Sequence, residues 1–536
     1  PPMSKKQKVS PAPPPPAQAP TASPEPEPGF AFPPKTPLAE LLLAGAAVLV
    51  WAACISNGFV FFDDDKAILY NPALQHPSLG KFFSGQNLGM YAPLSWIAYW
   101  VGQSLSGQEA WGYHLLGVGL HALNSVLAFR LLRGVTGRTW AAFFAALIFA
   151  VHPVQAEAVC WAAALSTVLF STFYLASAGA WWRWRQGGGV AWLLGSVGLF
   201  ALACLSKSAA VTLPLVLVAV EFYLRQREPA KGRPVWWAYL PYFALSVWFG
   251  LYTFSTRAAE GHDIEATSAA FSALDRFWMV SQTLLFYPFK LLVPLGFSIA
   301  YPFVKGGDGS WPPQYYAAPL VLAALAFLVW KKWRTRPDLL LGLALYLLPL
   351  VVMLPFRTVG SFELRSDRYV YLSCLGVFFV AGVLLENLRP ALRMAVLGVA
   401  ALLLGGLAFW QTAVWKDGVA MFENCVSKTP ESALCQCNLA YNELISLDFQ
   451  SAVQHYSAAL KSDATYIEAY NGRGQAYLNL RQIQPAYDDF DKAIKAGLST
   501  PKLFLNRGKC AVMLGKPQEA VPDLSEAILQ RAGVTP

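Results

Sequence analysis

Apolar runs of membrane length alternate with short charged loops along residues 37–413, and this pattern predicts an all-α, polytopic membrane domain. An α-helix rises about 1.5 Å per residue, so about 20 apolar residues cross the hydrocarbon core of a bilayer. From run length and flanking charge we predict about eleven spans, near residues 38–56, 111–133, 139–152, 157–182, 189–205, 208–225, 236–255, 314–331, 338–356, 370–388 and 391–413.

Two further apolar stretches, residues 92–105 and 277–303, are predicted to be interfacial or re-entrant pieces. Counting either one alone as a full span would move the later basic loops to the other side of the membrane. The second stretch contains Pro288, Pro294 and Pro302, and we expect these prolines to break it.

The basic residues between the spans gather in five loops. If Asp63–Asp65 lie on one side of the membrane, all five loops fall on the other side. Because cytoplasmic loops carry the excess of Lys and Arg, the N-terminus is predicted to be cytoplasmic. An odd number of spans then places the C-terminal segment outside. The loops contain Arg130, Arg133 and Arg138; Arg183 and Arg185; Arg225, Arg227, Lys231 and Arg233; Lys331, Lys332, Arg334 and Arg336; and Arg389 and Arg393.

Residues 414–536 have a soluble composition and a repeat of 34 residues, the period of tetratricopeptide helix pairs. Small residues allow close approach of the helices in each pair, and about three repeats forming an α-solenoid are predicted. Such an array offers a concave surface to a partner or a peptide, although a purely structural cap is the alternative. The matching small residues are Ala440, Gly474 and Gly508; Ala452, Ala486 and Ala520; and Ala459, Ala493 and Ala527.

Asn438, Asn471 and Asn506 recur near the first helix of each repeat. An amide side chain at these positions is suited to bind the backbone of an extended acceptor peptide. The same side chain is equally suited to a local hydrogen bond within its own helix. Both interpretations remain open at the level of the sequence.

Composition agrees with the membrane interpretation, because 55% of residues are apolar and only 14% are charged, with a mean hydropathy of +0.39. The net charge of +9 does not indicate nucleic-acid binding, since the basic residues lie in short loops between spans. Residues 1–36 form a Pro-rich tail that is expected to be disordered. Of the eight cysteines, Cys425, Cys435, Cys437 and Cys510 lie in the C-terminal segment, where a disulfide is possible in an oxidising compartment.

The sequence Phe61-Phe62-Asp63-Asp64-Asp65 directly follows the first apolar run. Carboxylates at the mouth of a span are costly unless they face water and serve a function. Asp63 or Asp64 is well placed to take a proton from an arriving hydroxyl group. Adjacent anions resist joint ionisation, so one of the three is expected to have a raised pKa. Alternatively, the cluster binds a divalent cation. No other cofactor is predicted.

Further polar groups fall on the same side of the membrane as this acidic loop. They include basic residues that run against the positive-inside trend, and binding of a lipid phosphate would explain them. The alternative for each is a partner carboxylate, such as Asp367 or Glu363 for Arg368. These groups are the turn from His152 to Glu157, Lys207 between two apolar runs, and Arg357, Glu363, Arg365, Asp367 and Arg368 before the tenth span.

The ordered set of motifs resembles the GT-C superfamily of membrane glycosyltransferases. In particular it resembles the transmembrane and tetratricopeptide-repeat-containing O-mannosyltransferase-like proteins and their bacterial relatives, over about residues 38–530. The matching segments are Phe61-Phe62-Asp63-Asp64 with Asn71-Pro72, Tyr91-Ala92-Pro93-Leu94-Ser95, Trp111-Gly112-Tyr113-His114-Leu115, His121-Ala122-Leu123-Asn124, His152-Pro153-Val154, Glu157-Ala158-Val159, Lys207 with Val211-Thr212-Leu213-Pro214, Asp367-Arg368-Tyr369-Val370-Tyr371-Leu372 and Trp415-Lys416-Asp417.

The resemblance implies a transferase that uses a polyprenyl-phosphate-linked sugar and a protein or peptide acceptor on the non-cytoplasmic face. It implies an integral protein of a bacterial inner membrane, with a periplasmic repeat domain. Asp63 or Asp64 would be the base, and Arg368 would hold the lipid phosphate with Lys207 and Arg365. His152, Glu157, Asp367, Tyr369 and Tyr91 would support the site.

One departure from the family concerns the segment after the His/Glu turn. The family often has a charged Glu-Arg-Lys-Asp run there, whereas this chain has Ala164-Leu165-Ser166-Thr167. A contact to the donor or to a metal is therefore expected to be absent. For this reason the sugar is not inferred from the eukaryotic members.

Three functional hypotheses follow from the residues. The first is an inverting glycosyltransferase in which a carboxylate deprotonates the acceptor and cations neutralise the departing phosphate. The second is a non-catalytic, membrane-anchored scaffold for assembly of an exported or envelope complex. The third is a transporter, which is disfavoured because few ionisable residues lie in the middle of the spans.

Overall fold

The computed structural model describes residues 36–85, 91–227, 236–259, 271–303, 305–306, 309–332, 335–354 and 365–531. These residues form helices and connecting turns and contain no strand, which confirms the all-α class. Arg357 and Glu363, two of the predicted polar loop residues, lie outside the described residues. The same is true of residues 1–35 of the Pro-rich tail.

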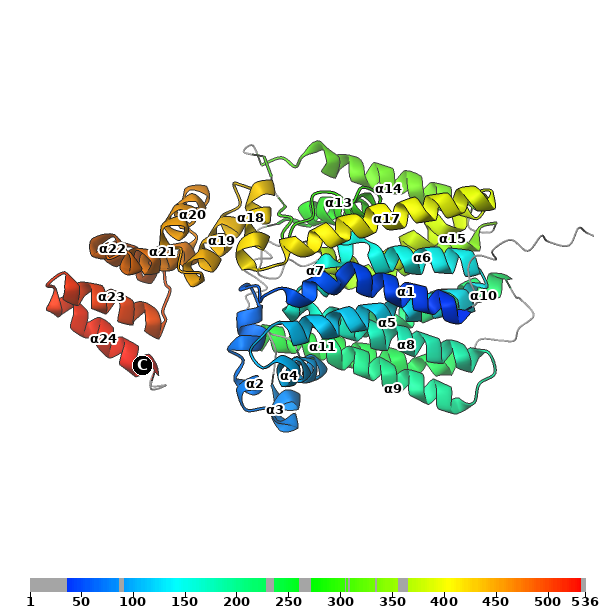
Figure 1. Cartoon of the computed structure of the whole chain (residues 1–536), viewed down its shortest axis with the longest axis horizontal. Coiled ribbons are helices and arrows are strands. Elements are labelled where there is room, and N and C mark those ends of the chain that lie inside the picture. The colour runs from blue at the N-terminus through cyan, green and yellow to red at the C-terminus, as the bar shows by residue number, and fades with distance from the viewer. Residues whose placement is uncertain are drawn as a thin grey trace, which may run out of the picture.

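Each predicted span corresponds to a helix, and most of these helices run side by side in one bundle (Figure 1). The bundle is built from α1 (Thr36–Trp51), α5 (Trp111–Thr136), α6 (Thr139–Val151), α8 (Leu165–Arg185), α9 (Val190–Ser206), α10 (Leu213–Arg227), α11 (Leu240–Ala259), α14 (Pro313–Lys332), α15 (Pro337–Leu350), α16 (Cys374–Leu385) and α17 (Pro390–Val414).

Six helical segments among the described residues are long and apolar enough to cross a membrane. A seventh is obtained if Thr139–Val151 and Pro153–Val159, bent by 53°, count as one span, and α9, α15 and α16 are shorter apolar helices. The chain is therefore an integral membrane protein, while the number of eleven spans stays a prediction.

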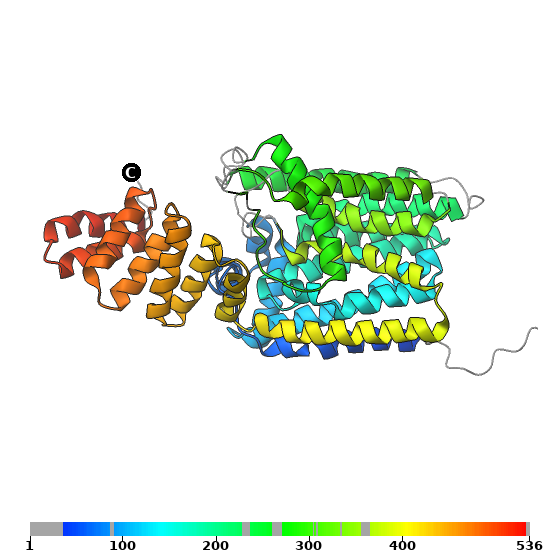
Figure 2. The same cartoon turned by 90° about the horizontal axis from the view of Figure 1, so that it is seen from above.

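The first interfacial piece predicted from the sequence is helix α4 (Pro93–Ser106). The second contains α13 (Ala273–Leu292), which lies across the direction of the long bundle helices (Figure 2). The expected break at Pro288 is wrong, because α13 continues through this residue and ends before Pro294. Proline frees the carbonyl four residues earlier, and here the carbonyl of Leu284 accepts a hydrogen bond from the Tyr346 hydroxyl at 2.9 Å.

The C-terminal helices form the predicted tetratricopeptide pairs. The small residues with the 34-residue period are buried between paired helices, and a Cβ atom at Gly474 would lie 2.7 Å from the Phe490 ring. A disulfide joins Cys425 to Cys435. The helices are α18 (Gly418–Lys428), α19 (Ala433–Ile445), α20 (Phe449–Ser462), α21 (Ile467–Asn479), α22 (Ile483–Lys495), α23 (Pro501–Met513) and α24 (Pro517–Arg531).

The repeat array is joined to the membrane helices by a continuous core. Met421, Phe422 and Cys425 of α18 belong to the same apolar cluster as the buried residues of the bundle, and so do Cys435 and Leu439 of α19. The first turns of the array are therefore packed on the bundle, and later repeats project away from it (Figure 2).

The opposite end of the bundle gathers the predicted basic loops. Arg138 ion-pairs with Asp338 at 2.7 Å and with Glu386 at 2.5 Å, and Arg130 pairs with Glu40 near the start of α1. This end lies away from the repeat array (Figure 1), as the arrangement of charge along the chain predicts.

Candidate functional site

The acidic loop follows α1 and the 3₁₀ turn η1 (Ala52–Ser56), and it faces the repeat array. Asp64 in this loop is completely buried. Its Oδ2 accepts a hydrogen bond from the Val60 N–H at 2.8 Å, and its Oδ1 accepts one from the Ala163 N–H at 2.7 Å. Burial raises the pKa of Asp64 to about 8. Asp64 therefore ties the loop to the chain around residue 163 and is closed off from an incoming substrate.

Asp63 lies in a different environment although it is the preceding residue. Its side chain is partly exposed, and its carboxylate accepts no hydrogen bond from the part of the chain that the structure describes. Burial raises the pKa of Asp63, whereas the nearby positive charge of Arg368 lowers it. The expected raised pKa is thus present, but burial contributes more than repulsion by Asp65. The Arg368 guanidinium is therefore near enough to affect the pKa of the Asp63 carboxyl, although Asp63 is not among the described residues that line the cavity beside Arg368.

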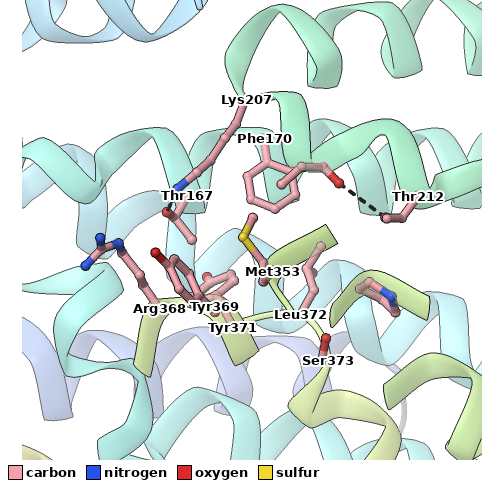
Figure 3. A pocket seen from close by; sticks show the side chains of 12 residues that line it. Thr167, Phe170, Lys207, Thr212, Met353, Arg368, Tyr369, Tyr371, Leu372 and Ser373 are labelled. Carbon is pink, nitrogen blue, oxygen red and sulfur yellow. Dashed lines mark hydrogen bonds between the residues drawn. The ribbon is translucent and has the colours of Figure 1, made fainter. Parts of the chain in front are cut away.

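A narrow cavity brings together two of the predicted phosphate ligands, Lys207 and Arg368 (Figure 3). Lys207 connects α9 to the turn η5 (Ser208–Thr212), and Arg368 lies on η8 (Asp367–Val370). The Lys207 Nζ donates a hydrogen bond to the Thr167 hydroxyl at 2.7 Å. The cavity volume is about 20 Å³, which is enough for a water molecule. A phosphate group must therefore displace side chains to enter.

Glu157 holds Arg368 in place. The Arg368 Nη1 forms an ion pair with Glu157, and the Arg368 backbone N–H donates to Glu157 Oε2 at 3.1 Å. The guanidinium group also lies 4.9 Å from the centre of the Trp161 ring and 5.2 Å from that of Tyr369. The predicted partner carboxylates for Arg368 were Asp367 and Glu363. Among the described residues the tertiary fold brings Glu157, and not Asp367, to the guanidinium group, while Glu363 lies outside the described residues.

Asp367, Glu157 and Ser298 are among the residues that line a second small pocket. Its Oδ2 accepts a hydrogen bond from the Tyr301 hydroxyl at 2.7 Å. Burial, followed by the charge of Glu157, raises the pKa of Asp367 to about 8. Asp367 thus supports the loop that carries Arg368 and is not its ion-pair partner.

Arg365, His152 and Tyr91, like Asp63 and Asp64, are not among the described residues that line the Lys207–Arg368 cavity. Arg365 is buried between the rings of Phe286 and Phe303, and it donates a hydrogen bond to Gln282 at 2.6 Å. His152 accepts a hydrogen bond from the Val154 N–H and lies 3.1 Å from the Leu291 carbonyl through its Nε2. Tyr91 packs edge-on against Tyr252. The structure gives these side chains contacts that stabilise the surrounding fold.

The predicted acceptor-binding asparagines differ from one another. The Asn438 side chain donates to the Leu434 carbonyl at 2.9 Å, which is the local helix hydrogen bond left open as an alternative. Asn506 is only 9% exposed. The Asn471 side-chain oxygen is buried and accepts no hydrogen bond within the described residues. The acceptor-binding role of the three asparagines therefore stays a prediction.

The sequence interpretation missed Trp161, Tyr441 and Asn442. The Trp161 ring lies 5.9 Å from the ring of Phe62 in the acidic loop and 5.9 Å from that of Trp415, at the start of the repeat segment. Tyr441 and Asn442 form hydrogen bonds with the acidic loop. A tryptophan near a span end is ordinary in membrane proteins, so composition alone does not single out Trp161.

A divalent cation was the second possibility for the acidic loop. The described residues contain no group of three or more His, Cys, Asp or Glu side chains arranged to hold a metal ion. The two oxygens of Asp64 are both engaged by backbone N–H groups. Asp63 and Asp65 are the two members of the loop with a carboxylate oxygen that accepts no hydrogen bond from described residues.

No family model matches this chain. It is similar to the protein O-mannosyl-transferase F38B6.6 of Caenorhabditis elegans, with 22% identity over 80% of this chain and 63% of the relative. It is also similar to human TMTC1, with 24% identity over 81% of this chain and 56% of the relative, and to mouse TMTC3, with 32% identity over 33% of this chain and 21% of the relative. The chain therefore spans less than two thirds of the length of these relatives.

Solved structures give weaker likenesses. An oligosaccharyltransferase of Archaeoglobus fulgidus matches with 12% identity over 78% of this chain and 58% of that chain, at a TM-score of 0.37. The tetratricopeptide protein YrrB matches with 30% identity over 20% of this chain and 55% of that chain, at a TM-score of 0.20. The predicted resemblance to the O-mannosyltransferase-like proteins is confirmed by the sequence relatives, whose names state that activity.

Proposed function

We propose that this protein is a glycosyltransferase that moves a sugar from a polyprenyl-phosphate donor to a hydroxyl group of a protein or peptide. One observation carries the proposal: Arg368 and Lys207 line a common cavity, and the charge of Arg368 acts on the carboxylate of Asp63. A base and a phosphate-binding pair are the two groups that this reaction requires, since the lipid phosphate is already a good leaving group.

Asp63 is the base in this proposal. Its carboxylate is partly exposed and uncommitted to hydrogen bonds within the described chain, whereas both oxygens of Asp64 are occupied. A raised pKa makes Asp63 a better proton acceptor than an ordinary aspartate. Asp63 would remove the proton of the acceptor hydroxyl as its oxygen attacks the anomeric carbon. Attack from the side opposite the phosphate inverts that carbon.

Arg368 and Lys207 would neutralise the phosphate as its bond to the sugar breaks. Guanidinium binds phosphate oxygens through two parallel hydrogen bonds, and the ammonium group adds a point charge. The donor phosphate would replace the Thr167 hydroxyl as the partner of Lys207 and widen the small cavity. Glu157 would keep the Arg368 guanidinium oriented through the contacts to its backbone and side chain.

The acceptor would approach from the side of the membrane that carries the repeat array. The basic loops lie at the other end of the bundle (Figure 1), which supports a cytoplasmic N-terminus and an external site. In a bacterial inner membrane this side is the periplasm. The repeats would present the acceptor peptide, with the unsatisfied oxygen of Asn471 as one contact.

The test compares intact masses of exported proteins from cells with the gene, without it, and with an Asp63→Asn variant. A sugar-sized mass difference that depends on both the gene and Asp63 would support the proposal. Identical exported proteins in all three strains, with normal amounts of the membrane protein, would contradict it and favour the scaffold hypothesis.

A further inference from the structure

The loop that carries Asp63 is in contact with the first helix pair of the repeat array. The Asn442 side chain on α19 donates a hydrogen bond to the Phe61 carbonyl at 3.1 Å. The neighbouring Tyr441 hydroxyl lies 3.4 Å from Asp65 Oδ2. These contacts lie on either side of Asp63 along the chain, and they join residues that are separated by 381 and 376 positions.

Asn442 occupies a tightly packed position. Its side chain is 3% exposed, and a Cβ atom added to Gly418 would lie 1.7 Å from its Oδ1. Its Nδ2 also donates to the Asn438 carbonyl at 2.8 Å. The amide is thus held between the start of α18, its own helix and the acidic loop, so its orientation toward Phe61 is determined by packing.

The beginning of the acidic loop is held by the segment that leads into the repeats. The Asn57 side chain donates to the carbonyls of Thr412 and Trp415, at 2.9 and 3.0 Å. The Gly58 N–H donates to the Lys416 carbonyl at 2.8 Å. The acidic loop is therefore attached to the repeat domain and to the segment that leads into it both before and after Asp63, the proposed base.

The pair Tyr441 and Asn442 is specific to the first repeat. Thirty-four residues later the corresponding residues are Gln475 and Ala476, and one period further they are Lys509 and Cys510. The tetratricopeptide fold itself therefore does not require a tyrosine followed by an asparagine at these positions. In the first repeat both residues contact the acidic loop.

We propose that Asn442 and Tyr441 are positioning residues for the base, so that helix α19 sets the rate of sugar transfer and does not only help to capture the acceptor. This inference rests on the proposed function. Asn442 would hold the backbone of Phe61, and Tyr441 would hold the buried carboxylate of Asp65, whose Oδ1 accepts no hydrogen bond from described residues. A shift of about 1 Å in a reacting group can lower a rate about 100-fold.

The test uses the full-length protein in detergent with two variants, Asn442→Asp and Tyr441→Phe. The first replaces the donor to Phe61 with an anion, and the second removes only the hydroxyl group. The matched controls are Asn479→Asp, whose amide donates to the Gln475 carbonyl within its own helix, and Tyr487→Phe, whose hydroxyl donates to Glu519 in a later repeat.

Three measurements separate positioning from general destabilisation. Hydrogen–deuterium exchange of peptides covering residues 57–71 reports the order of the loop. The intact-mass comparison identifies an acceptor protein, and a peptide from that protein serves as the substrate for transfer kinetics. These kinetics report kcat and the KM for the acceptor. Binding of farnesyl phosphate reports the state of the phosphate site. We expect Asn442→Asp to speed exchange in the loop and to lower kcat about 10-fold to 100-fold, with KM and farnesyl phosphate binding unchanged. Tyr441→Phe should show a smaller effect of the same kind.

The outcomes distinguish this inference from the proposed function. If the wild-type protein transfers sugar but loop exchange and kcat are the same in Asn442→Asp and Asn479→Asp, the positioning role is overturned and the proposed function stands. An acceptor KM that rises while kcat is kept would likewise overturn it, since α19 would then serve capture alone. A wild-type protein without transferase activity would overturn both.

Discussion

The two ends of the helical bundle contain the same kinds of charged residues, but the partners of the carboxylates differ between the ends. At the end remote from the repeats, Arg138 pairs with Asp338 and Glu386, and Glu221 pairs with both Arg185 and Arg225. At the end beside the repeats, Arg368 pairs with Glu157, but the buried Asp64 and the partly exposed Asp63 form no ion pair within the described structure, and the pKa of each is raised. Removing one partner of a buried ion pair destabilises a fold, whereas carboxylates with perturbed pKa values cluster at functional sites.

The cations at the two ends also have different surroundings. Arg138 forms ion pairs with two carboxylates, Asp338 and Glu386. Lys207 donates a hydrogen bond to the Thr167 hydroxyl and lines a cavity with Arg368, which itself pairs with Glu157. The comparison predicts that equivalent substitutions affect stability at the remote end and activity at the repeat end.

The largest effect is expected from removing the carboxylate of Asp63. Asp63→Asn should lower kcat about 1,000-fold, because general-base catalysis contributes a factor of this order. Glu40→Gln, which removes the carboxylate that pairs with Arg130 at the other end, should leave kcat unchanged. Transfer rates of the two purified variants, together with their melting temperatures, check this contrast. Equal transfer rates for Asp63→Asn and Glu40→Gln would contradict the proposed difference between the two ends of the bundle.

The next largest effect is expected from the cations. Lys207→Met should lower kcat with the lipid donor about 100-fold, as loss of a charge-stabilising donor does in other enzymes. Arg138→Met should instead reduce the free energy of unfolding by about 2 kcal/mol, because Asp338 and Glu386 lose a charged hydrogen-bond partner. Turnover per folded molecule and thermal unfolding distinguish the two results. Loss of turnover in Arg138→Met at full folding would contradict the proposal.

A smaller effect is expected on the pH dependence of transfer. Asp63 must lose its proton to act as the base, so kcat/KM should rise with pH through the raised pKa of Asp63. The positive charge of Arg368 lowers the pKa of Asp63. In Arg368→Gln the acidic limb of the pH–rate profile should therefore move to higher pH, in addition to a lower maximum. Arg130→Gln at the remote end is the control and should leave the limb in place.

The smallest effect is expected from Asp64→Asn and concerns stability. The pKa of Asp64 is about 8 in the folded protein and has an ordinary value of 3.8, so the folded state binds this proton more tightly. The contribution of Asp64 to stability is complete below pH 3.8 and is lost as the pH rises toward 8. Asn does not titrate, and it cannot accept hydrogen bonds from both Val60 and Ala163.

Asp64→Asn should accordingly lower the melting temperature by a few degrees at pH 5 and by less at pH 8.5. Melting curves in detergent at the two pH values check this prediction. A decrease of the same size at both pH values would show that Asp64 does not carry a tightly bound proton in the folded protein.

Much of the fold was predictable because its determinants are local. Each tetratricopeptide pair repeats the same contacts after 34 residues, so small residues such as Gly474 and Gly508 reveal the array without any structure. The membrane helices follow from run length, since the backbone must satisfy its own hydrogen bonds in lipid. The incorrect prediction of a helix break at Pro288 shows the limit of inference from local sequence. The carbonyl of Leu284, which proline leaves without a helical partner, accepts a hydrogen bond from Tyr346 of another helix.

The sequence by itself determined which residue types would form the site: carboxylates after the first helix, and Lys207 and Arg368 on the same side. Only the tertiary structure decided their roles. Asp63 and Asp64 are adjacent, yet it is the carboxylate of Asp64 that accepts a hydrogen bond from the Ala163 N–H. Arg368 is held by Glu157, which is 211 residues away in the sequence. Such contacts depend on packing between distant segments, and hydrophobic periodicity carries no information about them.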